Sequence, residues 1–361
     1  MKVFLAGGGT SGHIHPAVAI ADELKKQDAD TEVLFCGTAK GLEAQIIPSM
    51  GYPFEVIRAA QLPMKPSKKT IHAVREFLAG RKMCRKLIRE QKPDVVVGTG
   101  GFVCSPLIAA AHKEKVPILL HEQNAFPGRS NRMMSRYAGT VCTSFPKLDH
   151  YFHKKAKIVY TGNPIRGVFS QVDRNACREQ LGLASDEILI LAMGGSLGAR
   201  TVNQAIVALA GEITDPKVRI ILSVGKQRYA EVCEEAKNWP KSIEVFEYIS
   251  NPEVYLAAAD LFIGRAGAIT CAEVQAVGVP SVLVPYPYAA QDHQTYNARA
   301  FEEADAGVLL PDDQAVEKLP GIVKDLLSDK EKLGKMRENT LKLAIYDASS
   351  RICDEVRALA R

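Results

Sequence analysis

Short runs of aliphatic and β-branched residues alternate with helical patterns along the whole chain, and this alternation limits the folds it can adopt. In residues 17–24, for example, apolar side chains recur at i, i+3, i+4 and i+7, so they would share one helix face. Strands that alternate with helices predict βαβ units and parallel sheets. The length of 361 residues is enough for about two such domains. The predicted strands cover residues 3–6, 33–36, 95–97, 118–120, 188–192, 219–224, 261–263 and 282–284.

The second half of the chain repeats elements of the first half in the same order. "VFLAGGGTSG" near the start is similar to "LILAMGGSLGAR" from Leu189, and "PDVVVGTGG" from Pro93 is similar to "ADLFIGRAGAIT" from Ala259. All parallel α/β folds share part of this pattern, but the common order and glycine placement favour two similar domains. We expect the domains at residues 1–163 and 164–344, with a C-terminal helix at 345–361 packed on the first. Ligands bind at the carboxyl ends of parallel strands, so two Rossmann-like domains would face each other across a cleft lined by these loops.

Three glycines in the first loop, Gly7, Gly9 and Gly12, match the G-x-G-x-x-G pattern of dinucleotide-binding domains. An NAD site should also have an acid at the end of the second strand, but residues 35–38 read Phe-Cys-Gly-Thr. An NAD-dependent oxidoreductase is therefore disfavoured. The glycines still allow backbone N–H groups to approach a phosphate or sugar, and a helix N-terminus favours negative charge. Because residues 194–199 form a second such loop, we expect a substrate that bridges both domains, with its diphosphate at one of them.

Positive charge is concentrated in one segment. The net charge is +5, whereas residues 65–92 contain ten Lys and Arg residues and two acids, a local +8 that leaves −3 for the remainder. Apolar residues in this segment recur at i, i+3 and i+7 among the basic ones, a pattern that suits an anionic membrane surface, although a core-facing helix stripe is the alternative. No apolar run approaches the ~18–20 residues of a membrane span. The predicted membrane-docking residues are Lys68, Lys69, Ile71, Val74, Arg75, Phe77 and Leu78.

Several motifs together resemble those of the MurG family of N-acetylglucosaminyltransferases. In family order they are "GGGTSGHIHPAVAIA", "GTGGFVCSPLIAA", "HEQNAFPGRSN", "GNPIR", "GGSLGAR" and "RAGAITCAE…GVPSVLVPYPYAAQDHQTYNA", and they cover nearly the whole chain. The resemblance implies the glycosyltransferase-B fold. It also implies an inverting transfer of N-acetylglucosamine from UDP-N-acetylglucosamine (UDP-GlcNAc) to the 4-hydroxyl of MurNAc in lipid I, which forms lipid II and UDP for peptidoglycan synthesis.

The resemblance also sets expectations about partners and location. The expected partners are UDP-GlcNAc, lipid I, an anionic membrane surface and other cell-wall synthesis proteins, but no nucleic acid. The expected location is peripheral, on the cytoplasmic face of the cell membrane. No cofactor or essential metal is expected, because the D-x-D-like run at residues 28–30 follows the first helix, away from the strand carboxyl ends. The alternatives are another UDP-sugar enzyme of this fold, such as a UDP-GlcNAc 2-epimerase, and an inactive UDP-sugar-binding scaffold.

The candidate donor-site residues lie mainly in the second half. The Ser196 hydroxyl and its loop N–H groups could stabilise the departing diphosphate, although a plain tight turn is the alternative. By resemblance Glu273 binds the ribose hydroxyls, whereas from the sequence alone it is a helix-start acid. Arg166 matches an arginine of the nucleotide-sugar site, and its alternative is a surface residue in a hinge. The resemblance also assigns to the donor site Thr10, Ser11, Gly12, Asn124, Ile249, Ala268, Ile269, Thr270 and Gln294.

His13 is the candidate general base. It follows the first glycine loop, its imidazole titrates near neutral pH, and the attacking acceptor hydroxyl must lose a proton. The alternative is that His13 only shapes the loop or binds a phosphate. Glu122 is the second candidate for the base, and its alternative role is to position the acceptor.

Overall fold

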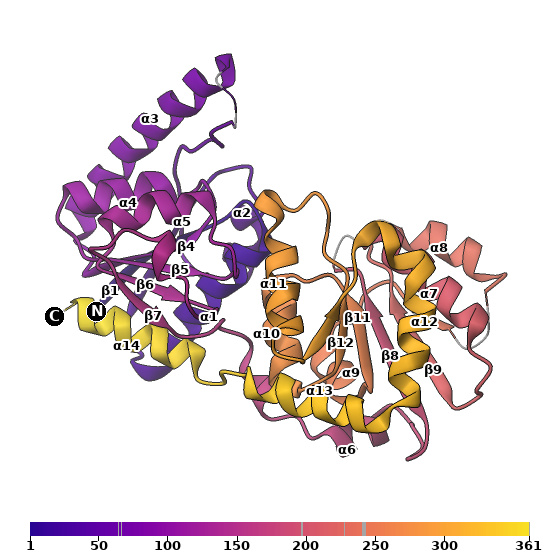
Figure 1. The fold of residues 1–361 in the computed structure, drawn as a ribbon. Helices are drawn as coiled ribbons and strands as arrows, with labels where there is room; N and C mark the ends of the chain where they lie inside the picture. Colours follow the sequence, from indigo (N-terminus) through magenta and orange to yellow (C-terminus); the bar gives the residue numbers. More distant parts are fainter. Residues whose placement is uncertain (64, 66, 196–197, 227, 240–242, 361) are drawn as a thin grey trace. The chain divides into compact units, whose positions relative to one another are not determined.

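The computed structural model divides the chain into two compact units (Figure 1). Unit 1 comprises Met1–Ile165 and Asp347–Arg361, and unit 2 comprises Arg166–Tyr346. The division lies two residues beyond the sequence-based boundary at 163/164. The structure describes residues 1–63, 65, 67–195, 198–226, 228–239 and 243–360.

Unit 1 is built on a seven-stranded sheet in the order β3-β2-β1-β4-β5-β6-β7, and all its strand pairs are parallel. In the register of the central strand β1, Val3 lies between Val33 of β2 and Val95 of β4. Every residue of β4 is buried, as expected for a parallel strand covered on both faces. The strands are β1 (Lys2–Gly7), β2 (Glu32–Gly37), β3 (Phe54–Val56), β4 (Val95–Gly100), β5 (Ile118–Glu122), β6 (Thr140–Thr143) and β7 (Lys157–Tyr160).

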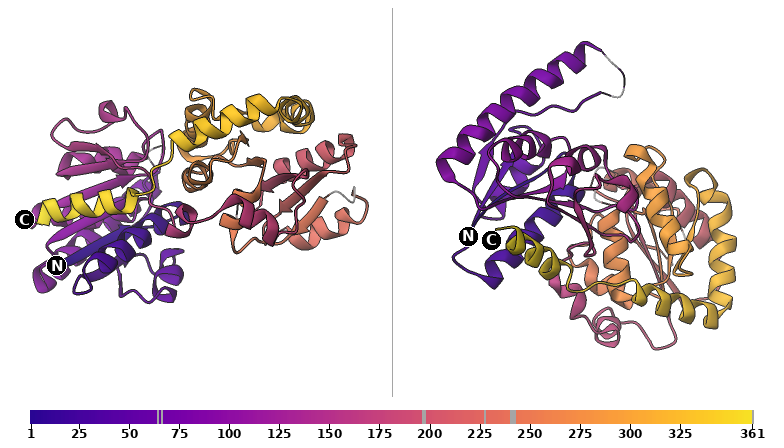
Figure 2. Two further views of the ribbon diagram at one scale, coloured as in Figure 1. Left: turned by 90° about the horizontal axis from the view of Figure 1, so that it is seen from below. Right: turned by 60° about the vertical axis from the view of Figure 1, so that its left-hand side comes forward.

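The last helix of the chain returns to unit 1. This helix, α14, packs against α1, and its Ile352, Cys353 and Val356 are buried in the core of unit 1. Figures 1 and 2 accordingly show α14 beside the sheet of this unit. The helices of unit 1 are α1 (Ser11–Gln27), α2 (Glu43–Ser49), α3 (Lys68–Gln91), α4 (Cys104–Lys113), α5 (Arg129–Met134) and α14 (Ala348–Ala360).

Unit 2 has a six-stranded sheet in the order β10-β9-β8-β11-β12-β13, again with all strand pairs parallel. The strands are β8 (Ile188–Met193), β9 (Val218–Ser223), β10 (Ile243–Phe246), β11 (Leu261–Gly264), β12 (Ser281–Leu283) and β13 (Gly307–Leu309). The helices are α6 (Arg174–Gln180), α7 (Arg200–Glu212), α8 (Tyr229–Ala236), α9 (Pro252–Ala258), α10 (Ala268–Val277), α11 (His293–Glu302), α12 (Ala315–Ser328) and α13 (Lys330–Lys342).

The strand order reverses once in each sheet, between β1 and β4 in unit 1 and between β8 and β11 in unit 2. In doubly wound sheets, ligands bind outside the carboxyl ends of the strands at this switch point. The two glycine loops connect β1 to α1 and β8 to α7, so each loop lies at the switch point of its own sheet. The predicted pair of Rossmann-like parallel-sheet domains is confirmed.

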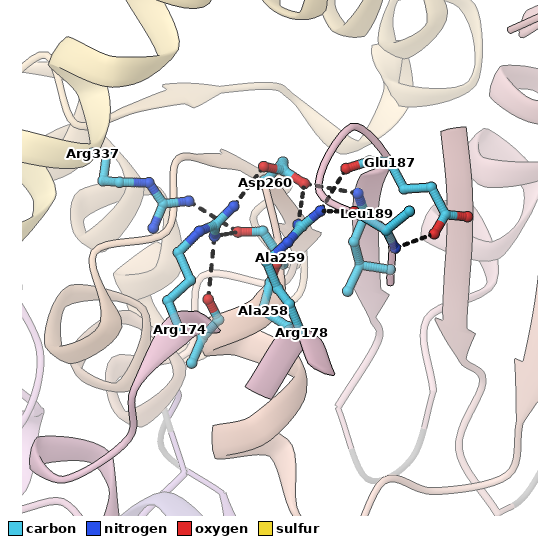
Figure 3. Close-up of polar contacts among 10 residues, drawn as sticks. Arg174, Arg178, Glu187, Leu189, Ala258, Ala259, Asp260 and Arg337 are labelled. Atoms are coloured by element: carbon cyan, nitrogen blue, oxygen red, sulfur yellow. Dashed lines mark hydrogen bonds and ion pairs between the residues drawn. The ribbon is translucent and has the colours of Figure 1, made fainter. Parts of the chain in front are cut away.

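The amino end of the unit 2 sheet is held by a half-buried ionic cluster around Asp260 (Figure 3). The Asp260 carboxylate accepts hydrogen bonds from Arg174 at 2.6 Å, from Arg178 at 3.0 Å and from the N–H of Leu189 at 2.8 Å. The same two arginines and Arg337 of α13 also donate to carbonyls at the end of α9. Burial, followed by the charge of Arg174, lowers the pKa of Arg337 to about 10. This cluster connects α6, α9 and α13 at the end opposite the glycine loop.

Candidate active site

The start of α1 is packed closely against β4. A side chain at Gly7 would place its Cβ 2.0 Å from Thr99 Oγ1 and 2.6 Å from the carbonyl oxygen of His13. Thr99 Oγ1 donates a hydrogen bond of 2.7 Å to the same His13 oxygen. The absence of a side chain at Gly7 therefore allows the first turn of α1, which begins at Ser11, to be fixed on the neighbouring strand.

The imidazole of His13 is half-buried at this switch point. Its Nδ1 lies 3.2 Å from the carbonyl oxygen of Gly8 and 3.0 Å from Thr10 Oγ1. The ring lies against Gly100 and Gly101, because a Cβ at Gly100 would be 3.0 Å from His13 Nε2. The φ angles of these glycines are +113° and +82°, values that side chains disfavour. The β4–α4 loop therefore makes room for the histidine ring.

Glu43, which the sequence analysis did not single out, reaches the first glycine loop. Its fully buried carboxylate accepts hydrogen bonds from the Gly9 N–H at 3.1 Å, the Thr38 N–H at 3.1 Å and the Thr38 hydroxyl at 2.7 Å. Burial alone would raise the pKa of Glu43, but these hydrogen bonds lower it below the usual value. Residues 35–38 contain no acid, but the chain that follows them folds back and brings Glu43 to the first glycine loop. Three glycines would clash with the Glu43 side chain if they had a Cβ: Gly8 and Gly41 with its carboxyl group, and Gly37 with its Cγ.

Glu122 is 1% exposed, and hydrogen-bond donors contact both of its carboxylate oxygens. Oε1 accepts from the N–H of Asn124 at 3.0 Å and from its side-chain amide at 3.3 Å. Oε2 accepts from the N–H of Gly128 and from Asn131 Nδ2, both at 2.9 Å. These four hydrogen bonds connect the carboxylate to the turn that follows β5 and orient Asn124.

The second glycine loop, between β8 and α7, is formed by close backbone packing. A Cβ at Gly198 would lie 2.0 Å from the carbonyl oxygen of Val224, and the φ angle of Gly198 is +78°. The N–H of Gly194 donates to Ser223 O, and that of Gly198 donates to Gly195 O. Within the part of this loop that the structure describes, no N–H donates to a carboxylate. Ser196 lies outside the described residues.

Two of the predicted donor-site residues, Arg166 and Glu273, influence each other electrostatically in unit 2. Glu273 is half-buried on α10, and burial raises its pKa to about 7, with Glu253 adding to the increase and Arg166 opposing it. Arg166 Nη2 lies 2.8 Å from Glu253 Oε2. The sequence analysis missed Glu253 because an acid in the first turn of a helix, here α9, is common for dipole reasons alone.

The remaining donor-site candidates of unit 2 also lie at the carboxyl edge of its sheet. Residues 268–270 form the first turn of α10, where N–H groups have no acceptor within the helix. Ile249 follows β10 and is 3% exposed. Gln294 Oε1 accepts a hydrogen bond of 2.9 Å from the N–H of Tyr286, which connects α11 to the loop after β12. Arg265 donates to two carbonyls of that loop and forms an ion pair with Asp312.

Predicted residues also lie at the carboxyl edge of the unit 1 sheet. Thr10 precedes α1 and Ser11 begins it, and both are exposed. Gly12 follows in the same turn, and Asn124 is half-buried after β5. The predicted residues at this edge are Thr10, Ser11, Gly12, His13, Glu122 and Asn124.

Helix α3 carries the basic segment and has two distinct apolar faces. Its inner face packs on α4, whereas its N-terminal half extends beyond the rest of unit 1 (Figures 1 and 2). Ile71, Val74 and Leu78 are 59%, 45% and 47% exposed, respectively, and Phe77 is half-buried. No helix among the described residues is long and apolar enough to cross a bilayer. The buried residues of the helix are Ala73, Gly80, Cys84 and Ile88.

The positive charges of α3 differ between its two halves. Near its C-terminal end, Arg85 and Arg89 form ion pairs with Glu114 at 2.6 and 2.8 Å. In the N-terminal half, no ion pair among the described residues involves Lys68, Lys69 or Arg75. The unneutralised charge therefore accompanies the exposed apolar row.

Comparison with known proteins places these features in a family. The glycosyltransferase family 28 N-terminal domain matches residues 3–143, and the family 28 C-terminal domain matches residues 189–352. A UDP-N-acetylglucosamine--N-acetylmuramyl-(pentapeptide) pyrophosphoryl-undecaprenol N-acetylglucosamine transferase of Acetivibrio thermocellus is 39% identical over 100% of this chain and 99% of its own. The transferase of the same name from Caldanaerobacter subterraneus is 41% identical over 99% of this chain and 100% of its own.

Solved structures agree with this result. The crystal structure of Acinetobacter baumannii MurG superposes with a TM-score of 0.83 at 29% identity and covers 99% of each chain. A UDP-N-acetylglucosamine 2-epimerase has a TM-score of 0.67 at 16% identity, which shows a common fold alone. Two parallel-sheet units with a glycine loop at each switch point, together with these matches, define a glycosyltransferase of the glycosyltransferase-B fold. The chain belongs to the MurG family within glycosyltransferase family 28.

Proposed function

We propose that this chain transfers N-acetylglucosamine from UDP-GlcNAc to the 4-hydroxyl of MurNAc in lipid I, with inversion at the anomeric carbon. The products are lipid II, a precursor for peptidoglycan synthesis, and UDP. The observation that carries the proposal is the full-length relationship to transferases named for this reaction. A UDP-GlcNAc 2-epimerase has the same fold, but at 16% identity the similarity shows the fold alone.

The direct test is to incubate the full chain with UDP-GlcNAc and a lipid I analogue. We expect UDP release that requires the acceptor, together with a GlcNAc–MurNAc disaccharide product detected by mass spectrometry. Conversion of UDP-GlcNAc to an isomer without UDP release would instead support an epimerase. Binding of UDP-GlcNAc with no turnover would support an inactive scaffold.

We assign donor binding to unit 2 and proton removal to unit 1. In unit 2, Glu273 would accept hydrogen bonds from the ribose hydroxyls, and Arg166 and the N-termini of α7 and α10 would stabilise the leaving diphosphate. Gln294 would contact the sugar, and the backbone at Ile249 would contact the uracil. His13 would accept the proton of the attacking 4-hydroxyl as that oxygen displaces UDP from the anomeric carbon.

The other unit 1 candidates would position the sugars. Residues 10–12 surround the start of α1, and we assign them to the donor sugar together with Asn124. The four hydrogen bonds that occupy the Glu122 carboxylate favour a role in orienting Asn124 and the acceptor over a role as the base. The proposed base is therefore His13.

We further propose that turnover requires no metal ion. No group of three or more His, Cys, Asp or Glu side chains that could hold a metal occurs among the residues the structure describes. Arg166 and the helix N-termini would supply the positive potential that a metal provides in other transferases. Activity should therefore survive EDTA. Loss of turnover in EDTA that magnesium or manganese restores would contradict this proposal.

We also propose that α3 binds the cytoplasmic face of the membrane peripherally. Each basic residue near an anionic surface contributes on the order of 1 kcal/mol, and inserted apolar side chains add to this. Other cell-wall synthesis proteins would be further partners on this surface. Support comes from the exposed apolar row beside Lys68 and Lys69, for which the described residues provide no ion pair.

The membrane proposal can be tested with a variant that combines Ile71→Ser and Leu78→Ser with Lys68→Glu and Lys69→Glu. We expect weaker sedimentation with anionic vesicles and slower turnover of long-chain lipid I, but little change with a short-chain soluble acceptor. Lys330→Glu with Lys335→Glu, on the exposed surface of α13, controls for the charge change, because it also replaces two lysines by glutamates. Equal losses with both acceptors would show that the row belongs to the acceptor site or the core.

A further inference from the structure

The peptide group between Gly8 and Gly9 is held at both of its polar ends. Its N–H, from Gly9, donates to Glu43 Oε2 at 3.1 Å, and its carbonyl oxygen, from Gly8, lies 3.2 Å from His13 Nδ1. A peptide group is planar and rigid, so its N–H and C=O cannot rotate independently of each other. A single peptide group therefore connects a buried carboxylate to the imidazole.

We infer that Glu43 is a positioning residue that acts through the Gly8–Gly9 peptide to hold His13 as the Nδ1–H tautomer, with Nε2 as the basic nitrogen. The catalytic part of this inference rests on the proposed role of His13. A carbonyl oxygen can only accept a hydrogen bond, so the contact to Gly8 requires a proton on Nδ1. The Thr10 hydroxyl, 3.0 Å from the same nitrogen, can donate or accept and therefore fits either tautomer.

This peptide needs an external restraint. It joins two glycines, which lack the side-chain clashes that limit backbone rotation, and Gly9 has a φ angle of +81°. If the peptide flipped, the Gly8 carbonyl would turn away from His13 and the N–H would face the ring. The Glu43 carboxylate opposes such a flip because the flip would break its hydrogen bond to the Gly9 N–H. A charged acceptor on the N–H also polarises the peptide and strengthens its carbonyl as an acceptor.

The restraint is itself well fixed. Glu43 is fully buried, and its other oxygen accepts from both the N–H and the hydroxyl of Thr38. These hydrogen bonds keep its pKa below the usual value, so the side chain is ionised at neutral pH. The carboxylate therefore has one orientation and a constant charge during turnover.

The consequence for the reaction concerns where the proton goes. With Nδ1 protonated, the lone pair of Nε2 accepts the proton of the acceptor hydroxyl as the new glycosidic bond forms and the bond to UDP breaks. The resulting imidazolium keeps its Nδ1–H bond to Gly8 O, which becomes a stronger, charge-assisted bond. A carboxylate that contacts a catalytic histidine directly has the same two effects. Here the peptide transmits them.

The main test is Glu43→Gln in the full chain, with NMR of ¹⁵N-labelled histidine to identify the protonated nitrogen of His13. The Gln side chain has one acceptor oxygen. If that oxygen stays with Thr38, its NH₂ group faces the Gly9 N–H and the link is lost. We expect the Nε2–H tautomer to increase, kcat to fall about 10- to 100-fold, and the KM for UDP-GlcNAc to stay within about twofold. An unchanged tautomer overturns the inference, even if kcat falls, because the effect would then be structural.

Two control variants separate the peptide link from general damage to unit 1. Thr38→Val removes one hydrogen bond to the same carboxylate but leaves the Gly9 link, so the Nδ1–H tautomer should persist. Asp22→Asn makes the same carboxylate-to-amide change at a partner of Tyr52, and kcat should be retained. Loss of the Nδ1–H tautomer in Thr38→Val, or a loss of kcat in Asp22→Asn equal to that in Glu43→Gln, would contradict the inference.

Two further measurements keep the inference testable on its own. If Glu43→Gln does not fold, the His13 tautomer is measured in Thr10→Val. This variant removes the Thr10 hydroxyl and keeps the contact of Nδ1 with Gly8 O. Persistence of the Nδ1–H tautomer supports the peptide link, and its loss overturns it in favour of the Thr10 hydroxyl. If His13→Ala leaves kcat unchanged, the proposed base is wrong, while the tautomer measurements still decide whether Glu43 sets the ring.

Discussion

The two glycine loops have similar sequences and equivalent positions in the fold, but their polar groups are used differently. In the first loop, between β1 and α1, the Gly9 N–H already donates to the Glu43 carboxylate. In the second loop, between β8 and α7, the described N–H groups of Gly194 and Gly198 donate to backbone carbonyls. The first loop thus contains its own anion, whereas the second leaves the N-terminus of α7 without one from the described residues. A glycine-rich fingerprint by itself therefore does not identify a phosphate site.

The difference originates in the neighbouring strand–helix connection of each sheet. After β2, the chain turns at Gly37 and Gly41 and brings Glu43 back to the first loop. After β9, the corresponding connection contains Gly225 and Lys226, and its first acid, Glu231, pairs with Arg228 instead. We therefore assign the chemistry to the first loop and the diphosphate to the second.

His13→Ala tests the assignment of the first loop and should have the largest effect. Removing a general base costs about 10²- to 10⁴-fold in kcat, and the affinity for UDP should stay nearly unchanged because the residue lies in unit 1. Steady-state kinetics and calorimetry with UDP would measure the two quantities. A loss confined to KM would make His13 a binding residue, and Glu122→Gln should then be measured in the same way.

Gly198→Ala tests the second loop. The new Cβ would lie 2.0 Å from Val224 O at a φ angle of +78°, so the loop must move, at a cost on the order of 1–3 kcal/mol. We expect a UDP affinity about 10- to 100-fold weaker. Gly211→Ala, in α7 with nothing within 4 Å of its Cβ, should leave the affinity unchanged.

The matched change beside the first loop is Gly101→Ala, in the β4–α4 loop, whose Cβ would lie 2.2 Å from Gly8 O. It should lower kcat and spare UDP affinity. If Gly101→Ala and Gly198→Ala weaken UDP binding equally, the two loops do not divide the work as we propose.

The sequence was sufficient to predict the features that depend on local patterns. The alternation of apolar runs predicts both parallel sheets, and glycine spacing predicts both β–α loops, because each depends on residues close together in the chain. It was not sufficient for Glu43, whose contact with Gly9 crosses 34 positions and depends on how the β2–α2 connection folds back. Glu253 was missed for a related reason: its pairing with Arg166 spans 87 positions, and locally it resembles any helix-start acid.

Glu273→Ala measures how much of the donor affinity depends on a side chain outside the second loop. Loss of a ribose acceptor leaves the hydroxyls unpaired and costs about 1–3 kcal/mol, or roughly 5- to 150-fold in UDP affinity. Calorimetry with UDP would measure this, with Glu302→Ala, an exposed acid on α11, as the control. An unchanged affinity would remove Glu273 from the site.

The smallest expected effect is a pH dependence of UDP affinity, which should come from the donor site in unit 2. Burial raises the pKa of Glu273 to about 7, so in the chain without ligand this carboxyl group is mostly neutral at pH 6 and mostly ionised at pH 8. An ionised carboxylate accepts hydrogen bonds more strongly than a neutral one, so UDP affinity should rise with pH and UDP binding should release protons near pH 7. If the bound carboxylate stays ionised, the gain from pH 6 to pH 8 is about tenfold.

Stability should change in the opposite direction. A carboxyl group whose folded pKa exceeds its unfolded value stabilises the fold at low pH, and this contribution is lost as pH rises through the folded pKa. Glu273→Gln removes both effects. UDP itself titrates in the same way with either protein, so the informative quantity is the difference between wild type and this variant across pH 6–8. A parallel pH dependence in both proteins would show that Glu273 does not titrate with binding. The His13→Ala variant should retain the wild-type pH dependence of UDP affinity, because the imidazole that it lacks lies at the first loop, which we do not assign to UDP.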